Sequence, residues 1–415
     1  MNSALMEAGR PYVSRRMIAR PVLGFLAVIL LLLLGGCAQG APLSGVSPDS
    51  LEISPNGDGD GDVATISYRI GRRSRVSAYL TDAAGRHYML RDDVLRMPAD
   101  QPYSLRFDGT VRSKEPPAVQ RVLPDGEYTY TIEATPETGA APVRRSGTIR
   151  VRDAVDELPL VEALKVLPET VTPNEDAVDD VAIFSYRLPI TATVSINLSS
   201  GTETIPFISD VVEGPYEQSH IWDGKRPDGG LLPTGVYTYT VRAADGVGNI
   251  VEQKGTVHIE SPGRSEARIT YADIAPTNVS LGNVITLTVR VKNTGDVPIR
   301  TQGPPSGYRY DANVPYSAVD GDRWAEKGGG FWRVGLDFGG GNGYPFRWAL
   351  SMRPPEEWNE PGVSDLFMPG DEVTITGSVI LRRREDRMFF FAGLIHEGVG
   401  FPEHRKSVTQ INVGF

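Results

Sequence analysis

The chain contains one segment twice, and this internal repeat constrains its fold more than any other sequence feature. The string SPNGDGDGDVATISYRI at 54–70 aligns with TPNEDAVDDVAIFSYRL at 172–188, an offset of 118 residues. Further blocks follow in the same order, and the last pair, SGTIRV at 146–151 and KGTVHI at 254–259, has an offset of 108. The shrinking offset places insertions and deletions between the blocks, where loops tolerate them. The repeat therefore predicts two copies of one module.

The repeated blocks have the pattern of β-strands. In 181–188 and 237–243, β-branched and aromatic residues recur at every second position, which places alternate side chains on one buried face. No window has a comparable helical period. About seven short strands in roughly 100 residues, with turns between them, are typical of a β-sandwich. The predicted fold class is all-β, with tandem immunoglobulin-like β-sandwiches after an N-terminal signal helix.

The order of motifs in the second copy resembles the FlgD-type immunoglobulin-like module, named for the flagellar hook-capping protein. These motifs are Pro-Asn-x-Asp, Ser-Tyr-Arg-Leu, Trp-Asp-Gly, Leu-Pro-x-Gly-x-Tyr-x-Tyr and Asp-x-x-Gly-Asn. The first copy has Phe107 where the second has Trp222, and it lacks the Asp-x-x-Gly-Asn turn. The resemblance implies an immunoglobulin-like fold with a spacer or adhesive role and no activity of its own. We interpret Trp222 as a core residue, with ligand stacking as the alternative.

The C-terminal part has a different pattern. The strings VITLTVRVKNTG at 284–295 and FMPGDEVTI at 367–375 resemble the adhesion-related immunoglobulin-like modules of the CARDB kind, which implies a third β-sandwich. The predicted organisation is a lipoprotein-type signal peptide at 1–36, a tether at 37–45, repeat modules at 46–153 and 160–260, and a C-terminal sandwich at 267–415.

The N-terminal segment has the features of an export signal. Basic residues, among them Arg15 and Arg16, precede an apolar run at 22–36 that is shorter than the ~20 residues needed to cross a bilayer. The run ends in Leu34-Gly35-Gly36-Cys37, which resembles the bacterial lipobox. This resemblance implies a lipid on Cys37, a membrane as partner and an extracytoplasmic location. The residues around Arg15 leave both the general and the twin-arginine export routes open.

An aspartate-rich loop in the first copy is a candidate calcium site. Asn56, Asp58, Asp60 and Asp62 carry oxygen ligands at the close spacing of an EF-hand-like loop, although Ser67 stands where the bidentate Glu belongs. The alternative is an Asx-type turn in which carboxylates accept hydrogen bonds from backbone N–H groups. A structural calcium ion is thus one of two interpretations, and no other cofactor is expected.

Aromatic residues crowd the C-terminal part, where four of the five tryptophans lie between 324 and 358 and glycine fills 8 of the 16 positions from 328 to 343. Rings beside glycine turns can stack on sugar rings, so Tyr308, Tyr310 and Trp324 are candidate ligand-binding residues. Polar contacts would come from Arg323 and from other residues nearby, namely Asp320, Asp322, Arg333 and Arg347. The alternative is that the aromatic rings fill a sandwich core.

Charge and motif content exclude several functions. A net charge of −10 disfavours nucleic acid as a partner, and a single cysteine excludes intrachain disulfides and Cys-rich metal sites. No nucleophile elbow, phosphate-binding loop or His-Glu-x-x-His motif occurs, so we expect no enzymatic activity. The predicted function is a lipid-anchored surface protein whose C-terminal module binds a cell-surface glycan or envelope protein. The alternative is an accessory polysaccharide- or protein-binding subunit of a cell-envelope assembly or export machine.

Overall fold

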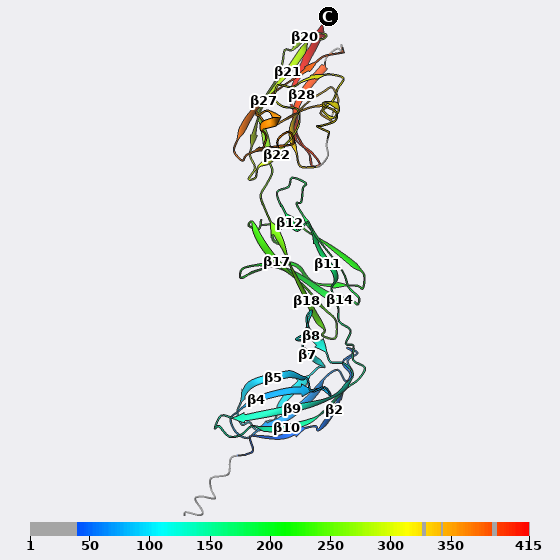
Figure 1. Cartoon of the computed structure of the whole chain (residues 1–415), viewed down its shortest axis with the longest axis vertical. Helices are drawn as coiled ribbons and strands as arrows, with labels where there is room; N and C mark the ends of the chain where they lie inside the picture. The colour runs from blue at the N-terminus through cyan, green and yellow to red at the C-terminus, as the bar shows by residue number, and fades with distance from the viewer. Residues whose placement is uncertain (1–39, 326–328, 342, 384–387, 415) are drawn as a thin grey trace, which may run out of the picture. The chain divides into compact units, whose positions relative to one another are not determined.

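The computed structural model describes residues 40–414, apart from 326–328, 342 and 384–387. The described residues form β-strands and two short 3₁₀ turns, Tyr316–Ala318 and Pro355–Glu357, so the all-β prediction is confirmed (Figure 1). The predicted signal helix and Cys37 lie outside the described residues. Within the described ranges, no helix is long and apolar enough to span a membrane. The chain divides into two compact units, one containing 122–156 and all residues before 113, the other 113–121 and 157–415.

The first unit is a β-sandwich. Its strands are β1 (Leu43–Ser47), β2 (Ser50–Ile53), β3 (Ala64–Ile70), β4 (Ser74–Thr81), β5 (His87–Arg96), β6 (Tyr103–Phe107), β7 (Thr110–Arg112), β9 (Gly126–Pro136) and β10 (Val143–Val151). One sheet has the order β1-β3-β6, and the facing sheet has the order β2-β10-β9-β4-β5. The short strand β2 runs parallel to β10, whereas the other pairs in these two sheets are antiparallel.

The second unit begins with a β-sandwich formed by the second copy of the repeat. Its strands are β11 (Glu162–Leu167), β12 (Thr170–Val171), β13 (Ala182–Arg187), β14 (Ala192–Ser200), β15 (Glu203–Glu213), β16 (Glu217–Trp222), β17 (Gly235–Ala244) and β18 (Ile250–Ile259). One sheet has the order β11-β13-β16, and the other contains β15-β14-β17-β18 with β12 parallel to β18. This strand order matches that of the first sandwich strand for strand. The segment 113–121 belongs to this unit because β8 (Ala118–Val122) pairs with β18.

Alternating burial explains why the repeated sequence forms these sheets. In β3 and β13 alternate side chains are buried, and the core positions coincide in the two copies. Tyr68 and its counterpart Tyr186 are 1% and 2% exposed, and Phe107 and Trp222 are 3% and 2% exposed. The Trp222 ring packs edge-on against Phe184, with ring centroids 6.4 Å apart. The interpretation of Trp222 as a core residue is therefore confirmed.

In each copy, one glycine leaves space for the ring of a buried tyrosine. A Cβ on Gly147 would lie 2.5 Å from the carbonyl oxygen of Asp49 and from the Tyr130 ring, closer than real Cβ contacts. Gly255 faces the Tyr239 ring in the same way in the second copy. The glycine and the tyrosine are cross-strand partners in both sheets, so they were retained as a pair.

The C-terminal sandwich has its own strand order. Its strands are β19 (Ala267–Ala275), β20 (Asn278–Ser280), β21 (Val284–Asn293), β22 (Ile299–Thr301), β23 (Arg309–Asp311), β24 (Trp332–Phe338), β25 (Phe346–Ala349), β26 (Asp365–Phe367), β27 (Glu372–Ile380), β28 (Met388–His396) and β29 (Gly400–Gly414). One sheet has the order β19-β21-β27-β23 and the other β20-β29-β28-β24-β22-β26, with β25 paired to β24. As in the repeats, a short early strand, β20, runs parallel to the last strand.

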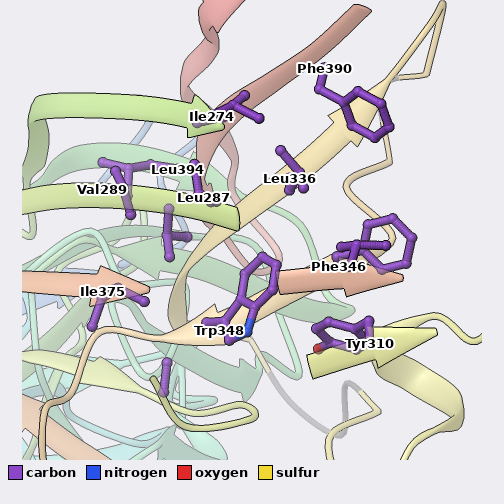
Figure 2. Close-up of a cluster of buried hydrophobic side chains, with 14 of the residues drawn as sticks. Ile274, Leu287, Val289, Tyr310, Leu336, Phe346, Trp348, Ile375, Phe390 and Leu394 are labelled. Atoms are coloured by element: carbon purple, nitrogen blue, oxygen red, sulfur yellow. The ribbon is translucent and has the colours of Figure 1, made fainter. Parts of the chain in front are cut away.

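The core of this sandwich lies between its two sheets. Figure 2 shows part of it, with Leu287 and Ile375 from one sheet and the rings of Phe346 and Trp348 from the other. The aromatic and glycine-rich segment is thus part of the sandwich, because β24 and β25 form a hairpin and β24 pairs with β28. From Trp332 to Asp337 every side chain of β24 is buried, on both faces of the strand.

Candidate functional site

The aspartate-rich loop of the first copy is an Asx-type turn built around Asp62. The Asp62 carboxylate accepts hydrogen bonds from the backbone N–H groups of Asn56 (3.1 Å), Gly57 (3.0 Å) and Gly59 (2.8 Å). These bonds, led by the one from Gly57, lower the pKa of Asp62. The side chains of Asn56 and Asp58 each accept a further backbone N–H bond, two residues ahead of themselves.

The corresponding loop of the second copy has the same hydrogen bonds. Asp180 accepts from the backbone N–H groups of Asn174 (3.0 Å), Glu175 (2.7 Å) and Ala177 (2.7 Å). The prediction overlooked Asp180, although it stands at the repeat offset of 118 from Asp62. The shared loop geometry therefore depends on one aspartate in each copy rather than on the glycines, which the second copy lacks.

The four predicted calcium ligands do not fit a calcium ion in this conformation. Both carboxylate oxygens of Asp62 accept backbone N–H bonds, and Asp58 Oδ2 accepts from the Asn56 side chain at 3.1 Å. Calcium needs six to eight oxygen atoms converging on one point. Among the described residues, no group of three or more His, Cys, Asp or Glu side chains is placed to hold a metal ion. The geometry favours the Asx-type turn over the calcium loop.

The rings of the C-terminal part lie mainly in the core. Tyr310 and Trp324 are each 1% exposed, and Tyr308 is half-buried against Tyr310 with ring centroids 5.0 Å apart. The Tyr310 hydroxyl donates to the carbonyl oxygen of Arg347 at 2.6 Å, and burial raises the pKa of Tyr310. This placement favours the core alternative for Tyr310 and Trp324, whose ring faces are covered by protein.

Arg323 is the exposed member of the predicted ligand-binding set. Its guanidinium lies 4.4 Å from the centroid of the Trp324 ring, and Nη2 donates to the carbonyl oxygen of Gly362 at 2.7 Å. Trp324 Nε1 donates to Asp320 Oδ2 at 2.9 Å, which fixes the ring below the guanidinium. Three of the predicted residues thus adjoin one another, while the proposed ligand contact through Arg323 stays a prediction.

Arg333 and Arg347, expected as surface contacts for a ligand, are instead buried, with exposed fractions of 0% and 8%. Both contact Glu397: Arg333 Nη1 lies 3.1 Å from Glu397 Oε1, and Arg347 Nη1 forms a hydrogen-bonded ion pair with the same oxygen. The ring of Tyr316 lies against both guanidinium groups, at 5.0 and 4.1 Å from its centroid. Burial lowers the pKa of Arg333. The Glu397 carboxylate is therefore the counter-ion of two buried guanidinium groups.

A second buried polar cluster lies in the second sandwich. Glu213 is 5% exposed; its Oε2 accepts from the Tyr186 hydroxyl at 2.7 Å, and its Oε1 lies 2.7 Å from His220 Nε2. Burial and the bond to Glu213 raise the pKa of Tyr186. No sequence pattern indicates this cluster, because its residues come from three different strands that meet only in the folded sandwich.

The two copies differ on the outer face of their smaller sheet. Ile183 and Ile221 are cross-strand partners that are 42% and 66% exposed, and Leu167, the partner of Ile183 on the other side, is 59% exposed. In the first copy the positions of Ile183 and Ile221 hold Thr65 and Arg106, which are also paired and exposed. The second copy therefore carries an aliphatic row that the first lacks.

Comparison with known proteins gives a likeness of fold. No family model matches the chain, and no curated protein matches it in sequence. Among solved structures it is similar to the FN1–FN3 domains of chicken CNTN1, at 9% identity over 90% of this chain and 100% of that chain, with a TM-score of 0.27.

Two further solved structures are similar to this chain at low sequence identity and low TM-score. The fibronectin(III)-like modules of Clostridium thermocellum CbhA match at 14% identity, over 53% of this chain and 92% of that chain, with a TM-score of 0.21. A tetra-tandem repeat from the extending region of a large adhesion protein matches at 14% identity, over 87% and 74% of the two chains, with a TM-score of 0.19. Likenesses this weak carry no argument about activity or partners, and the FlgD-type and CARDB assignments stay predictions.

The Asx-type turn predicts how the first sandwich responds to pH and calcium. Replacing Asp62 with Asn should lower the melting temperature, because backbone N–H groups lose a charged acceptor. Since the folded-state pKa of Asp62 is lowered, its contribution is complete above about pH 4 and is lost as the pH falls through that lowered pKa. The difference in melting temperature between Asp62→Asn and wild type should therefore become smaller in acid. Asp60→Asn is the control, and a calcium-induced rise in melting temperature would contradict the turn interpretation.

The shared carboxylate predicts a large effect at Glu397. Glu397→Gln should lower the free energy of unfolding by about 3–5 kcal/mol, because two buried guanidinium groups lose their counter-ion. The control is Glu266→Gln, which removes a carboxylate paired with the exposed side chains of Arg264 and Arg268 and should cost less than about 1 kcal/mol. Urea unfolding followed by tryptophan fluorescence measures both. Equal losses in the two variants would show that the buried cluster is not stabilised by Glu397.

Proposed function

We propose that this chain is a non-enzymatic, extracytoplasmic protein in which two immunoglobulin-like modules form a spacer and the C-terminal sandwich is the binding module. Its ligand would be a cell-surface glycan or an envelope protein. The observation that carries the proposal is that the residues common to the two repeats are mainly structural. The repeats share a buried framework and a turn, whereas exposed positions such as Thr65 and Ile183 differ.

The shared positions are structural. Tyr68 and Tyr186 occupy equivalent core positions, and Asp62 and Asp180 organise the same turn. Exposed pairs diverge, as Thr65 and Ile183 do. A repeated module whose shared residues form mainly a core and one turn adds length to a chain rather than a second copy of a site. This supports a spacer role for both repeats.

The C-terminal sandwich is the part without a copy, which supports its assignment as the binding module. It has a strand order different from that of the repeats and a strand, β24, that is buried on both faces. Its surface presents Arg323, whose guanidinium lies 4.4 Å from the centroid of the Trp324 ring. A planar guanidinium in that position can donate several hydrogen bonds to the hydroxyl or carboxylate groups of a glycan.

The membrane attachment in this proposal comes from the sequence. Cys37 is the one cysteine of the chain and follows Leu34-Gly35-Gly36 at the end of the apolar run. Acylation there would tether the first repeat, and the order of modules along the chain would put the C-terminal sandwich last.

The alternative function, an accessory subunit of a cell-envelope assembly or export machine, draws support from the second sandwich. The aliphatic row of Leu167, Ile183 and Ile221 is exposed, whereas the first copy has polar residues at the corresponding positions of the two isoleucines. Contiguous exposed apolar residues mark protein contacts more often than glycan contacts. A protein partner at this row would favour the alternative.

Lipid attachment is tested at Cys37. Cys37→Ala should abolish incorporation of labelled palmitate and move the protein from the membrane fraction to the soluble fraction, because no other thiol can accept the lipid. Gln39→Ala is the control and should be labelled like wild type. Equal palmitate labelling of the Cys37→Ala variant would rule out the anchor and leave the binding role of the C-terminal sandwich untouched.

The binding role is tested with the chain from residue 38 onward on a glycan array and in envelope-protein pull-downs. The protein should bind a defined set of glycans or one envelope protein, and removal of residues 264–415 should abolish this. Arg323→Ala should weaken glycan binding by roughly tenfold, because a charged hydrogen-bond donor is lost. Arg309→Ala, an exposed arginine of the same sandwich, should bind like wild type. Binding that survives the truncation would refute the assignment.

A further inference from the structure

The C-terminal sandwich contains a cavity of about 260 Å³ between its two sheets. Val379 comes from β27 in one sheet, while Phe346 of β25 and Phe390 of β28 come from the other. These three side chains are 0% to 1% exposed, so the cavity reaches the hydrophobic core. Figure 2 shows Phe346 and Phe390 among the buried side chains of this domain.

The walls of the cavity are apolar. Besides the three core side chains they comprise Ala312, Phe338, Leu381 and Met388. The Phe338 ring lies 6.4 Å from Phe346 and 5.5 Å from Phe390 between ring centroids, so three phenyl rings border one space. A sugar ring would leave its hydroxyl groups without partners among such walls, whereas an apolar group loses nothing on entering. The inner part of the cavity therefore favours an apolar group over a sugar ring.

The polar residues of the cavity are Asn313, Arg382 and Arg383, which are exposed and so mark its mouth. Arg382 is held in place by Asp311, with Nε 2.7 Å from Asp311 Oδ2. The Asp311 carboxylate also accepts from the backbone N–H of Asn313 at 3.1 Å, and these two bonds lower the pKa of Asp311. Across the described ranges, no acidic side chain forms an ion pair with Arg383. Arg383 is exposed at this mouth, where its guanidinium can meet an incoming ligand.

We infer that this cavity binds a single unbranched acyl chain of medium length whose carboxylate lies at Arg383. The volume is just below the roughly 300–1,000 Å³ of sites for drug-sized ligands, which suits one slender chain rather than a fused ring system. Apolar walls hold the tail, and the arginine at the mouth attracts the charged head. This site goes beyond the glycan- or protein-binding role proposed above and does not depend on it.

Calorimetric titration of the full chain from residue 38 with decanoate and with decanol tests the inference. Decanoate should bind at one site, and decanol should bind more weakly because it lacks the charge. Arg383→Gln should weaken decanoate binding by roughly tenfold and leave decanol unchanged. Arg309→Gln is the matched control, because Arg309 is exposed on β23 and does not line the cavity. Phosphatidylglycerol vesicles are the second arm, in which the acyl chain comes from a bilayer lipid.

Filling the cavity supplies the second test. Ala312→Leu should reduce decanoate binding by more than roughly tenfold, and the smaller Ala312→Val should have an intermediate effect, with thermal unfolding showing that each variant is folded. Binding to vesicles that Ala312→Leu blocks supports the same acyl site. The inference is overturned if the folded wild-type chain does not bind decanoate, or if the Ala312 and Arg383 variants bind decanoate as wild type does.

Discussion

The structure depends on the burial of alternate side chains between two facing sheets. A strand with apolar residues at every second position has one hydrophobic face. A second sheet covers that face here, because the described residues include no long helix. In both repeats this requirement fixes the same strands in the same order. It also tolerates exchange within the core, as the replacement of Phe107 by Trp222 between the copies illustrates.

Polar side chains organise both an exposed loop of each repeat and the interior of the C-terminal sandwich. Asp62 and Asp180 satisfy successive backbone N–H groups in a loop that has glycines in one copy and none in the other. Glu397 performs a comparable task inside the C-terminal sandwich, where it contacts both Arg333 and Arg347. The first kind of contact is local in sequence, and the second joins distant strands. This difference separates what a sequence pattern can reveal from what it cannot.

Much of the repeat architecture was accessible from the sequence because its signals are local. Alternation predicted strands such as β13 and β17, and the motif around Trp222 predicted its burial. The C-terminal sandwich was harder. Because β24 is buried on both faces, it holds Arg333 and Asp337 inside, and a charged residue in a strand ordinarily indicates solvent. The sequence therefore predicts a ligand surface for Arg333 and Arg347, and it gives no signal for their buried partner Glu397.

The sequence by itself determined that the chain is all-β and that one module occurs twice, and it left the aspartate-rich loop open between a calcium site and an Asx-type turn. These features follow from the periodicity of the sequence and from the order of its motifs, because alternating burial and short-range hydrogen bonds involve residues close together in the chain. Tertiary structure decided which rings become core, which arginines are buried, and where the two C-terminal sheets leave a cavity between Phe346 and Phe390. Those outcomes depend on how side chains from distant strands fill a shared volume, and no local pattern encodes that packing.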